Sequence, residues 1–69
     1  MKRTTPHTAA DYRAAIDSRD YDRLSAAYER AMLLSHDLRF RQADRETARL
    51  YLGALTIAMR DAAERRLAQ

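Results

Sequence analysis

Residues 48–62 read ARLYLGALTIAMRDA, an apolar stretch with the period of an α-helix. Its apolar positions cover roughly 220° of the helix circumference, whereas a helix packed on one neighbour needs a stripe of about 100°. Leu50 and Ile57 extend this wide face at its edge. In a chain of 69 residues, so much apolar surface predicts contact with a second molecule. The other residues of the wide face are Tyr51, Leu52, Ala54, Leu55, Ala58, Met59 and Ala62.

The composition predicts a single small all-α domain that spans residues 1–69. One Gly and one Pro are typical of a helical chain, and a chain of this length lies near the lower limit for one hydrophobic core. The lack of cysteine excludes disulfides and thiolate zinc sites. His7 and His36 have no carboxylate cluster beside them, so we expect no metal site and no cofactor.

The chain has no run of about 20 apolar residues that could cross a bilayer, so we expect no membrane partner. Residues 1–7 include basic residues but no apolar stretch follows them, unlike in a signal peptide, and we expect them to be disordered. A cytoplasmic location follows. Arg outnumbers Lys, which is typical of GC-rich bacterial or phage coding sequences and suggests a bacterial host cell.

A short N-terminal helix is expected to end near Arg19, with Tyr12, Ala15 and Ile16 on its apolar side. It begins either at Pro6, which suits a first helical position, or at Thr8, which forms a capping-box pattern with Asp11. Three anchors are too few to hold this helix alone. It must therefore pack against the rest of the chain.

A second helix is expected over about residues 20–40, capped by Ser18 or Asp20. The apolar spacing 24, 28, 31, 35, 38 is that of a bundle seam, interrupted by Ser35, whose hydroxyl we expect to bond the carbonyl four residues earlier. Beyond Leu38 the pattern fails, which predicts a turn near residues 41–43 with Asp44 as the next N-cap. A third helix then covers about residues 45–67.

These elements predict a helical hairpin preceded by a short helix. Gly53 lowers helix stability, so we expect it at a close contact with another backbone. Two hairpins paired antiparallel would bury the wide face in a homodimeric four-helix bundle. The residues expected at the dimer interface are Leu52, Leu55, Ile57 and Met59.

The expected hairpin tip is rich in arginine. Arg41, Arg45 and Arg49 recur at four-residue spacing and could follow the phosphates of a nucleic acid. Acidic residues Asp44 and Glu46 lie among them and offset part of the charge. A solvated tip, a protein-binding surface and a nucleic-acid-binding surface all remain open.

Apolar residues near the tip favour a protein partner. Leu33 falls on the polar side of its helix, Phe40 falls at the tip, and Leu50 falls at the edge of the wide face. Apolar residues rimmed by arginine resemble a protein interface with anchoring residues. The residues expected to bind the partner are Phe40, Arg41, Arg45, Arg49, Leu50 and Tyr51.

No catalytic residues are expected. Ser35, His36 and Asp37 have the composition of a catalytic triad, but consecutive residues on a helix point about 100° apart and cannot form a relay.

The segment over residues 48–66, ARLYLGALTIAMRDAAERR, is similar to the second helix of a family of small phage-encoded anti-activators, which block bacterial quorum sensing and pilus motility. The resemblance implies a two-helix hairpin that forms a homodimer. It also implies partner contact by the aromatic residue that is Trp in the family and Tyr51 here. The N-terminal helix and the Arg-rich tip have no counterpart in the family. The shared pattern comprises Ala48, Tyr51, Leu52, Ala54, Leu55, Ala58, Met59, Asp61 and Ala62.

The sequence therefore predicts a non-enzymatic regulator that binds a bacterial regulator or enzyme and inhibits or sequesters it. The alternative is a small basic nucleic-acid-binding regulator that uses the arginines of the tip. A secretion-type chaperone hairpin is a third interpretation.

Overall fold

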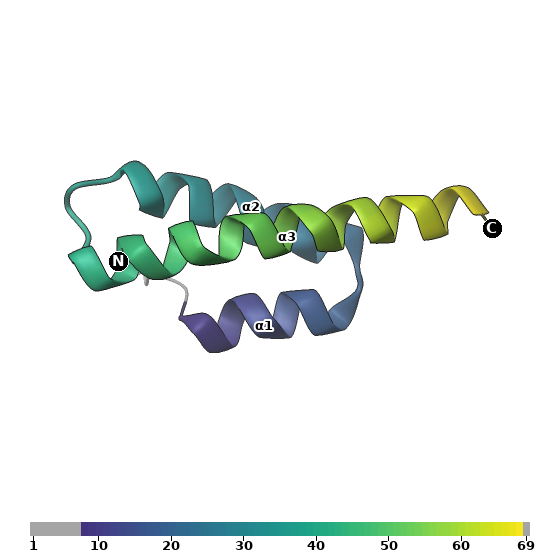
Figure 1. The fold of residues 1–69 in the computed structure, drawn as a ribbon, viewed down its shortest axis with the longest axis horizontal. Helices are drawn as coiled ribbons and strands as arrows, with labels where there is room; N and C mark the ends of the chain where they lie inside the picture. The colour runs from purple at the N-terminus through teal and green to yellow at the C-terminus, as the bar shows by residue number, and fades with distance from the viewer. Residues whose placement is uncertain (1–7, 69) are drawn as a thin grey trace, which may run out of the picture.

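The computed structural model describes residues 8–68, and it contains three helices and no strand within that range (Figure 1). Helix α1 spans Ala9–Ser18, α2 spans Tyr21–His36 and α3 spans Gln42–Ala68. The all-α prediction is confirmed. The prediction that residues 1–7 are disordered lies outside the described residues.

Helix α1 begins at the capping box that the sequence offered. The backbone N–H of Thr8 donates to Asp11 Oδ2 at 2.7 Å, and the N–H of Asp11 donates back to Thr8 Oγ1 at 3.4 Å. This reciprocal pair satisfies two donors that a helix end leaves open. Of the two expected starts, the structure therefore has the one at Thr8.

A tight turn joins α1 to α2. Arg19 closes α1 in the left-handed region, with φ 55°, and its N–H donates to the carbonyl of Ile16 at 3.3 Å. Asp20 then caps α2 by accepting from the N–H of Asp22 at 3.2 Å. Asp20, and not Ser18, is thus the N-cap of α2, because the Ser18 hydroxyl donates to the carbonyl of Ala15.

The helix break lies earlier than the sequence pattern indicated. α2 ends at His36 rather than near residue 40, and α3 begins at Gln42 rather than residue 45. The cause is Asp37, whose carboxylate accepts from the backbone N–H of Arg39 and so competes with helix continuation. The carbonyl of Arg41 accepts from the N–H of Arg45, which places Asp44 inside the first turn of α3 and not at its N-cap.

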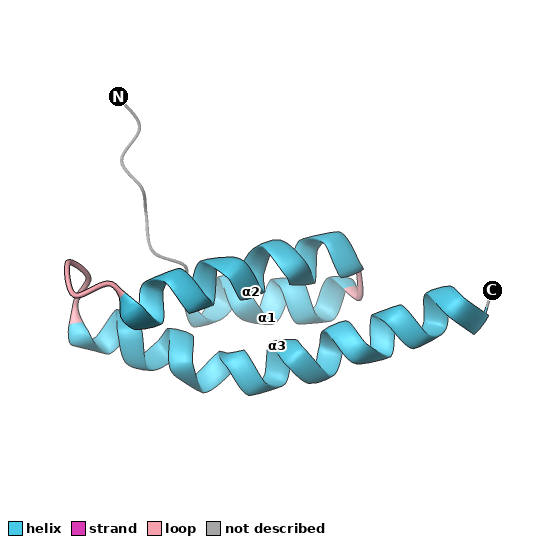
Figure 2. Cartoon of the chain, turned by 90° about the horizontal axis from the view of Figure 1, so that it is seen from above, coloured by secondary structure: helices cyan, strands magenta, loops and turns pink. Residues whose placement is uncertain are grey.

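The three helices form two layers (Figure 2). Helices α1 and α2 lie in one layer, and α3 crosses the other layer antiparallel to α2, with its C-terminal end projecting past both (Figure 1). The core lies between the layers, where Tyr12, Leu24, Leu34 and Leu55 are fully buried. The rest of the core consists mainly of alanines, which let the layers approach closely.

One expected packing detail is corrected, and a second is not found within the chain. The Ser35 hydroxyl donates to the carbonyl of Met32, three residues earlier, at 2.8 Å, and not to the carbonyl four residues earlier. A Cβ at Gly53 would meet nothing within 4 Å. Gly53 therefore makes no close helix contact within the chain, because it lies on the side of α3 that faces away from the core.

Candidate protein-interaction surfaces

Exposed apolar residues gather on two separate surfaces of the molecule. The first, the α2 groove, is formed by Tyr28, Met32, Leu33, His36 and Leu38, with Glu29, Asp37 and Arg39 at its rim. The second, the α3 ridge, consists of Leu50, Gly53, Ala54 and Ile57 on the outer side of α3. Large exposed apolar patches with polar rims are typical of interaction sites.

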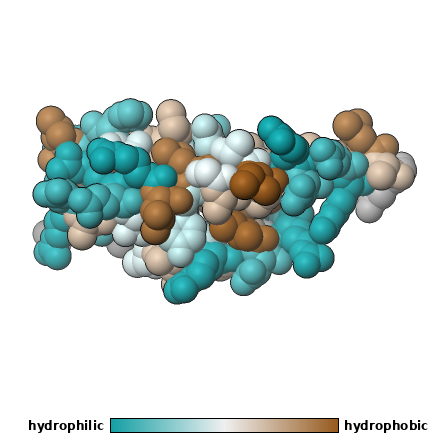
Figure 3. All heavy atoms as spheres, viewed as in Figure 1, coloured by the Kyte–Doolittle hydropathy of each residue, from teal (hydrophilic) through white to brown (hydrophobic). Residues whose placement is uncertain are grey.

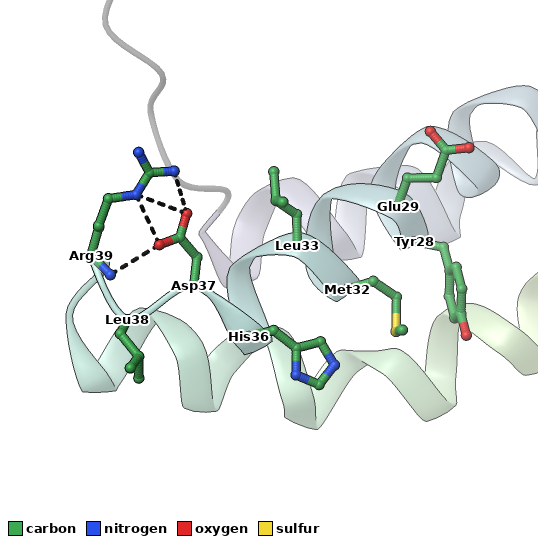
Figure 4. Close-up of a pocket in the computed structure, with 8 residues that line it drawn as sticks. All are labelled: Tyr28, Glu29, Met32, Leu33, His36, Asp37, Leu38 and Arg39. Carbon is green, nitrogen blue, oxygen red and sulfur yellow. Dashed lines mark hydrogen bonds and ion pairs between the residues drawn. The ribbon is translucent and has the colours of Figure 1, made fainter.

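The α2 groove is an open hollow of about 800 Å³ along α2 and the loop that follows it (Figure 4). Tyr28, Met32 and His36 project from α2, and Leu38 projects from the loop that follows it (Figure 4). Leu33 is 55 % exposed and Leu38 is 82 % exposed. These side chains are available to a partner without any rearrangement of the fold.

The rim of the α2 groove is fixed by an ion pair across the loop. Arg39 donates from Nη2 to Asp37 Oδ2 at 2.7 Å and from Nε to Asp37 Oδ1 at 3.0 Å (Figure 4). The side-chain and backbone hydrogen bonds from Arg39 lower the pKa of Asp37 from 3.8 to about 2. The pair also holds the loop that presents Leu38.

The α3 ridge lies on the side of α3 opposite the core. Leu50 is 77 % exposed and Ile57 is 63 % exposed. In the view onto α3, apolar side chains gather over the middle of the helix and hydrophilic ones surround them (Figure 3). The predicted wide face of the third helix is therefore divided: one part is core, and the edge formed by Leu50 and Ile57 is open.

The residues predicted to bind a partner are not all exposed. Arg41, Arg49 and Leu50 are exposed, whereas Phe40, Arg45 and Tyr51 are half-buried. The Tyr51 ring stacks on Tyr12 with 5.4 Å between centroids and 25° between planes, so much of its surface holds α1 to α3. Phe40 packs against the core.

The three arginines predicted to form a row, Arg41, Arg45 and Arg49, differ in their exposure to solvent and in their contacts. Nε of Arg45 is shielded from solvent and has no hydrogen-bond partner within residues 8–68. Nη2 of Arg49 lies 3.5 Å from the carbonyl of Ser35 and bridges the end of α2 to α3. Of the three arginines, only Arg41 is exposed and makes no side-chain contact of this kind. This makes the row less suited to binding the phosphates of a nucleic acid.

The residues predicted for the dimer interface separate into two groups. Leu55 is fully buried within one chain, and Leu52 and Met59 are half-buried against the same core. Leu55 therefore has no exposed surface with which to contact a second chain in this structure. Ile57 is the one residue of the four that lies open.

Sequence reasoning missed Leu38 as a surface residue. Leu38 carried the helical spacing of a buried seam, and it leaves that seam because α2 ends before it. The signal that could have revealed this is Asp37, a residue that favours turns and caps over helix interiors. Leu33, in contrast, lies exposed as the sequence predicts.

Ser35, His36 and Asp37 do not form a relay in the structure. The Ser35 hydroxyl donates to Met32, and the Asp37 carboxylate binds Arg39. Within residues 8–68 no group of His, Asp and Glu side chains is placed to hold a metal ion. None of the described helices is long and apolar enough to cross a membrane.

Comparison with known proteins gives no relative. No family model, no curated protein and no solved structure matches the chain.

Proposed function

We propose that this protein is a non-enzymatic regulator that binds a bacterial protein through the α2 groove and inhibits or sequesters it by occlusion. The observation that supports this proposal is the open apolar hollow at the end of α2, with Leu33 and Leu38 exposed beside fixed charges. Apolar anchors provide binding energy, and the polar rim orients the partner.

The kind of partner comes from the sequence. The similarity of residues 48–66 to phage-encoded anti-activators favours a bacterial transcriptional or motility regulator as the target. The protein acts in the host cytoplasm in this proposal. Arg41 is exposed at the end of the loop that carries Leu38, and in this proposal it adds charge pairs with acidic residues of the partner.

The protein works as a homodimer in this proposal. The exposed α3 ridge supports self-association, because its apolar side chains lie on the side of α3 that faces away from the core and remain exposed. A dimer formed there would leave the α2 groove free for the partner.

Site-specific photo-cross-linking in bacterial lysate tests the function. A photoreactive residue at position 33 or 38 should capture the same bacterial protein, whereas the residue at position 67 should not. Leu67 is a matched control because it is 88 % exposed and lies outside the groove. The purified captured protein should lose activity when the wild-type chain is added, and keep it when Leu38→Glu is added instead.

The same experiment separates the nucleic-acid alternative. Capture that disappears after nuclease treatment, or that falls steeply with salt and depends on Arg41, would favour nucleic acid. Capture that persists in Leu33→Glu and Leu38→Glu would contradict the α2 groove as the binding surface.

A further inference from the structure

We infer that a cleft beside the turn between α1 and α2 binds an acidic peptide segment, whose carboxylates pair with Arg19, Arg65 and Arg66. This site, the arginine cleft, lies at the opposite end of α2 from the α2 groove, because Tyr21 begins that helix and His36 ends it. The inference goes beyond the proposed function. Partner binding at the α2 groove does not depend on it.

The arginine cleft is formed by two segments far apart in sequence. The turn between α1 and α2 lies at the same end of the molecule as the projecting C-terminal part of α3 (Figure 1). The cleft between them has a volume of about 230 Å³. A mostly apolar hollow of about 300 Å³ adjoins it, since Tyr21 and Arg66 line both. The other lining residues are Arg19, Asp20, Ala62 and Arg65 in the cleft, and Ala63 and Leu67 in the hollow.

The periodicity of α3 brings two of the arginines to the cleft. Buried positions of α3 recur every seven residues, at Ala48, Leu55 and Ala62. On an amphipathic helix the positions three and four residues later share the same face. After Ala62 these positions are Arg65 and Arg66, on the part of α3 that projects past the other helices. Arginines therefore occupy the face of α3 on which the apolar seam would otherwise continue.

Arg19 supplies the third guanidinium from a backbone conformation that favours glycine. It ends α1 with φ 55°, and glycine is the usual residue at such a helix end because a Cβ strains left-handed backbone. The dipole of α1 would favour a cation in the last helical turn equally well without strain, yet that turn has no basic residue. A binding role for its side chain accounts for arginine at this position.

Positive charge predominates in the arginine cleft. The three arginines are exposed, and within residues 8–68 none of them forms an ion pair. Asp20 is the one carboxylate among the described lining residues, and it already accepts from the N–H of Asp22 as the N-cap of α2. A guanidinium group donates two parallel hydrogen bonds to a carboxylate. A segment with two neighbouring carboxylates therefore matches the charge of the cleft.

The surroundings of the cleft favour a peptide over the phosphate backbone of a nucleic acid. Asp61 and Glu64 are exposed and lie beside Arg65 around a further hollow of α3. Their carboxylates would repel an extended polyanion, whereas a short acidic segment need not reach them. The apolar hollow beside Tyr21 and Leu67 accommodates a large apolar side chain, which a sugar-phosphate backbone does not carry.

A fluorescein-labelled octapeptide, Gly-Ser-Glu-Glu-Leu-Phe-Gly-Ser, tests the inference by fluorescence anisotropy with the full chain. The peptide should bind, and two-dimensional NMR should show shifted amide signals at Arg19, Tyr21 and Arg66. A control peptide with Gln in place of both Glu should bind roughly five- to tenfold more weakly. No binding of the acidic peptide at millimolar protein concentration would overturn the inference, as would equal binding of the two peptides.

Arg19→Gly separates binding from stability. Glycine adopts the left-handed conformation without strain, so the melting midpoint should rise, while loss of the guanidinium should weaken peptide binding by roughly two- to fivefold. Arg65→Gln and Arg66→Gln should weaken binding similarly and retain helicity. Arg60→Gln is the control and should bind as wild type does, because Arg60 is exposed and lies about 200° around α3 from Ala62. Wild-type affinity in all three cleft variants would contradict the site.

Competition distinguishes a peptide from a nucleic acid. A short DNA duplex should displace the labelled peptide only at a much higher concentration than the unlabelled peptide does. Displacement by DNA at an equal or lower concentration, lost in Arg65→Gln and Arg66→Gln, would assign the arginine cleft to nucleic acid and overturn the inference. Neither result alters cross-linking at positions 33 and 38, so this inference and the proposed function fail separately.

Discussion

Asp37 determines where α2 ends and how the α2 groove is built. Its carboxylate accepts the backbone N–H and the guanidinium of Arg39, and its carbonyl accepts the N–H of Phe40 at 3.2 Å. These bonds fold residues 37–40 into a turn. One side chain therefore both stops a helix and presents Leu38 to solvent.

Asp37→Asn should remove this local stabilisation in a pH-dependent way. The pKa of Asp37 is lowered from 3.8 to about 2, so the ionised carboxylate stabilises the folded state above about pH 4. That contribution is lost as the pH falls from about 4 to about 2. Thermal melts from pH 2 to pH 7 should show a lower midpoint for the variant at neutral pH and convergence with wild type near pH 2. A constant difference across that range would contradict this account.

Gly53→Ala should stabilise the monomeric chain. The added Cβ meets nothing within 4 Å, and alanine favours a helix interior by about 1 kcal/mol over glycine, which raises the melting midpoint of a small domain by roughly 4–8 °C. The measurement is a melt at a concentration below dimerisation. Ala54→Gly is the matched control and should lower the midpoint similarly. A lower midpoint for Gly53→Ala would reveal a contact within the chain.

At the scale of the element, two consecutive leucines of α2 lie on different faces of the helix. Leu34 is fully buried between the layers, whereas Leu33 is 55 % exposed in the α2 groove. The 100° step of the helix places consecutive residues on different faces. The same residue type therefore stabilises the fold at one position and remains available for binding at the next.

Leu34→Ala and Leu33→Ala form a matched pair for this assignment. Leu34→Ala should lower the free energy of unfolding by about 2–5 kcal/mol, because it leaves a cavity in the core. Leu33→Ala should change it by roughly 0.5 kcal/mol or less. Urea denaturation followed by circular dichroism measures both. Similar losses in the two variants would mean that α2 is rotated from the orientation described.

At the scale of the whole molecule, two layers of helices leave little interior. The described chain has extents of 41 × 26 × 17 Å, so one helix thickness separates the core from solvent on either side. Much of the core is alanine. A small domain with such a core gains stability when it buries further apolar surface against a second copy.

Ile57→Asp should therefore produce a folded monomer. Ile57 is 63 % exposed on the α3 ridge, so the charge disrupts association without entering the core. Light scattering should show half the mass of the dimer that we propose for the wild-type chain, and circular dichroism should show retained helicity. Leu67→Asp, outside the ridge, should remain dimeric. Loss of helicity in Ile57→Asp would contradict the exposed position of Ile57 on the α3 ridge.

The sequence by itself determined the elements that depend on local chemistry. The three helices follow from residue types and periodicity. The capping box of Thr8 and Asp11 and the Asp20 cap were each one of two starts that the sequence offered, because their hydrogen bonds join residues within a few positions. The exposure of Leu33 also follows from its place on the polar side of α2.

The tertiary structure alone decided how the wide apolar face of the third helix is divided. Periodicity placed Leu50, Leu55 and Ile57 on one broad face, but it could not say which part the layer of α1 and α2 covers. That layer buries Leu55 and stacks Tyr12 on Tyr51, while Leu50 and Ile57 stay open. The position of two packed helices is a property of the whole chain, since it depends on residues far apart in sequence.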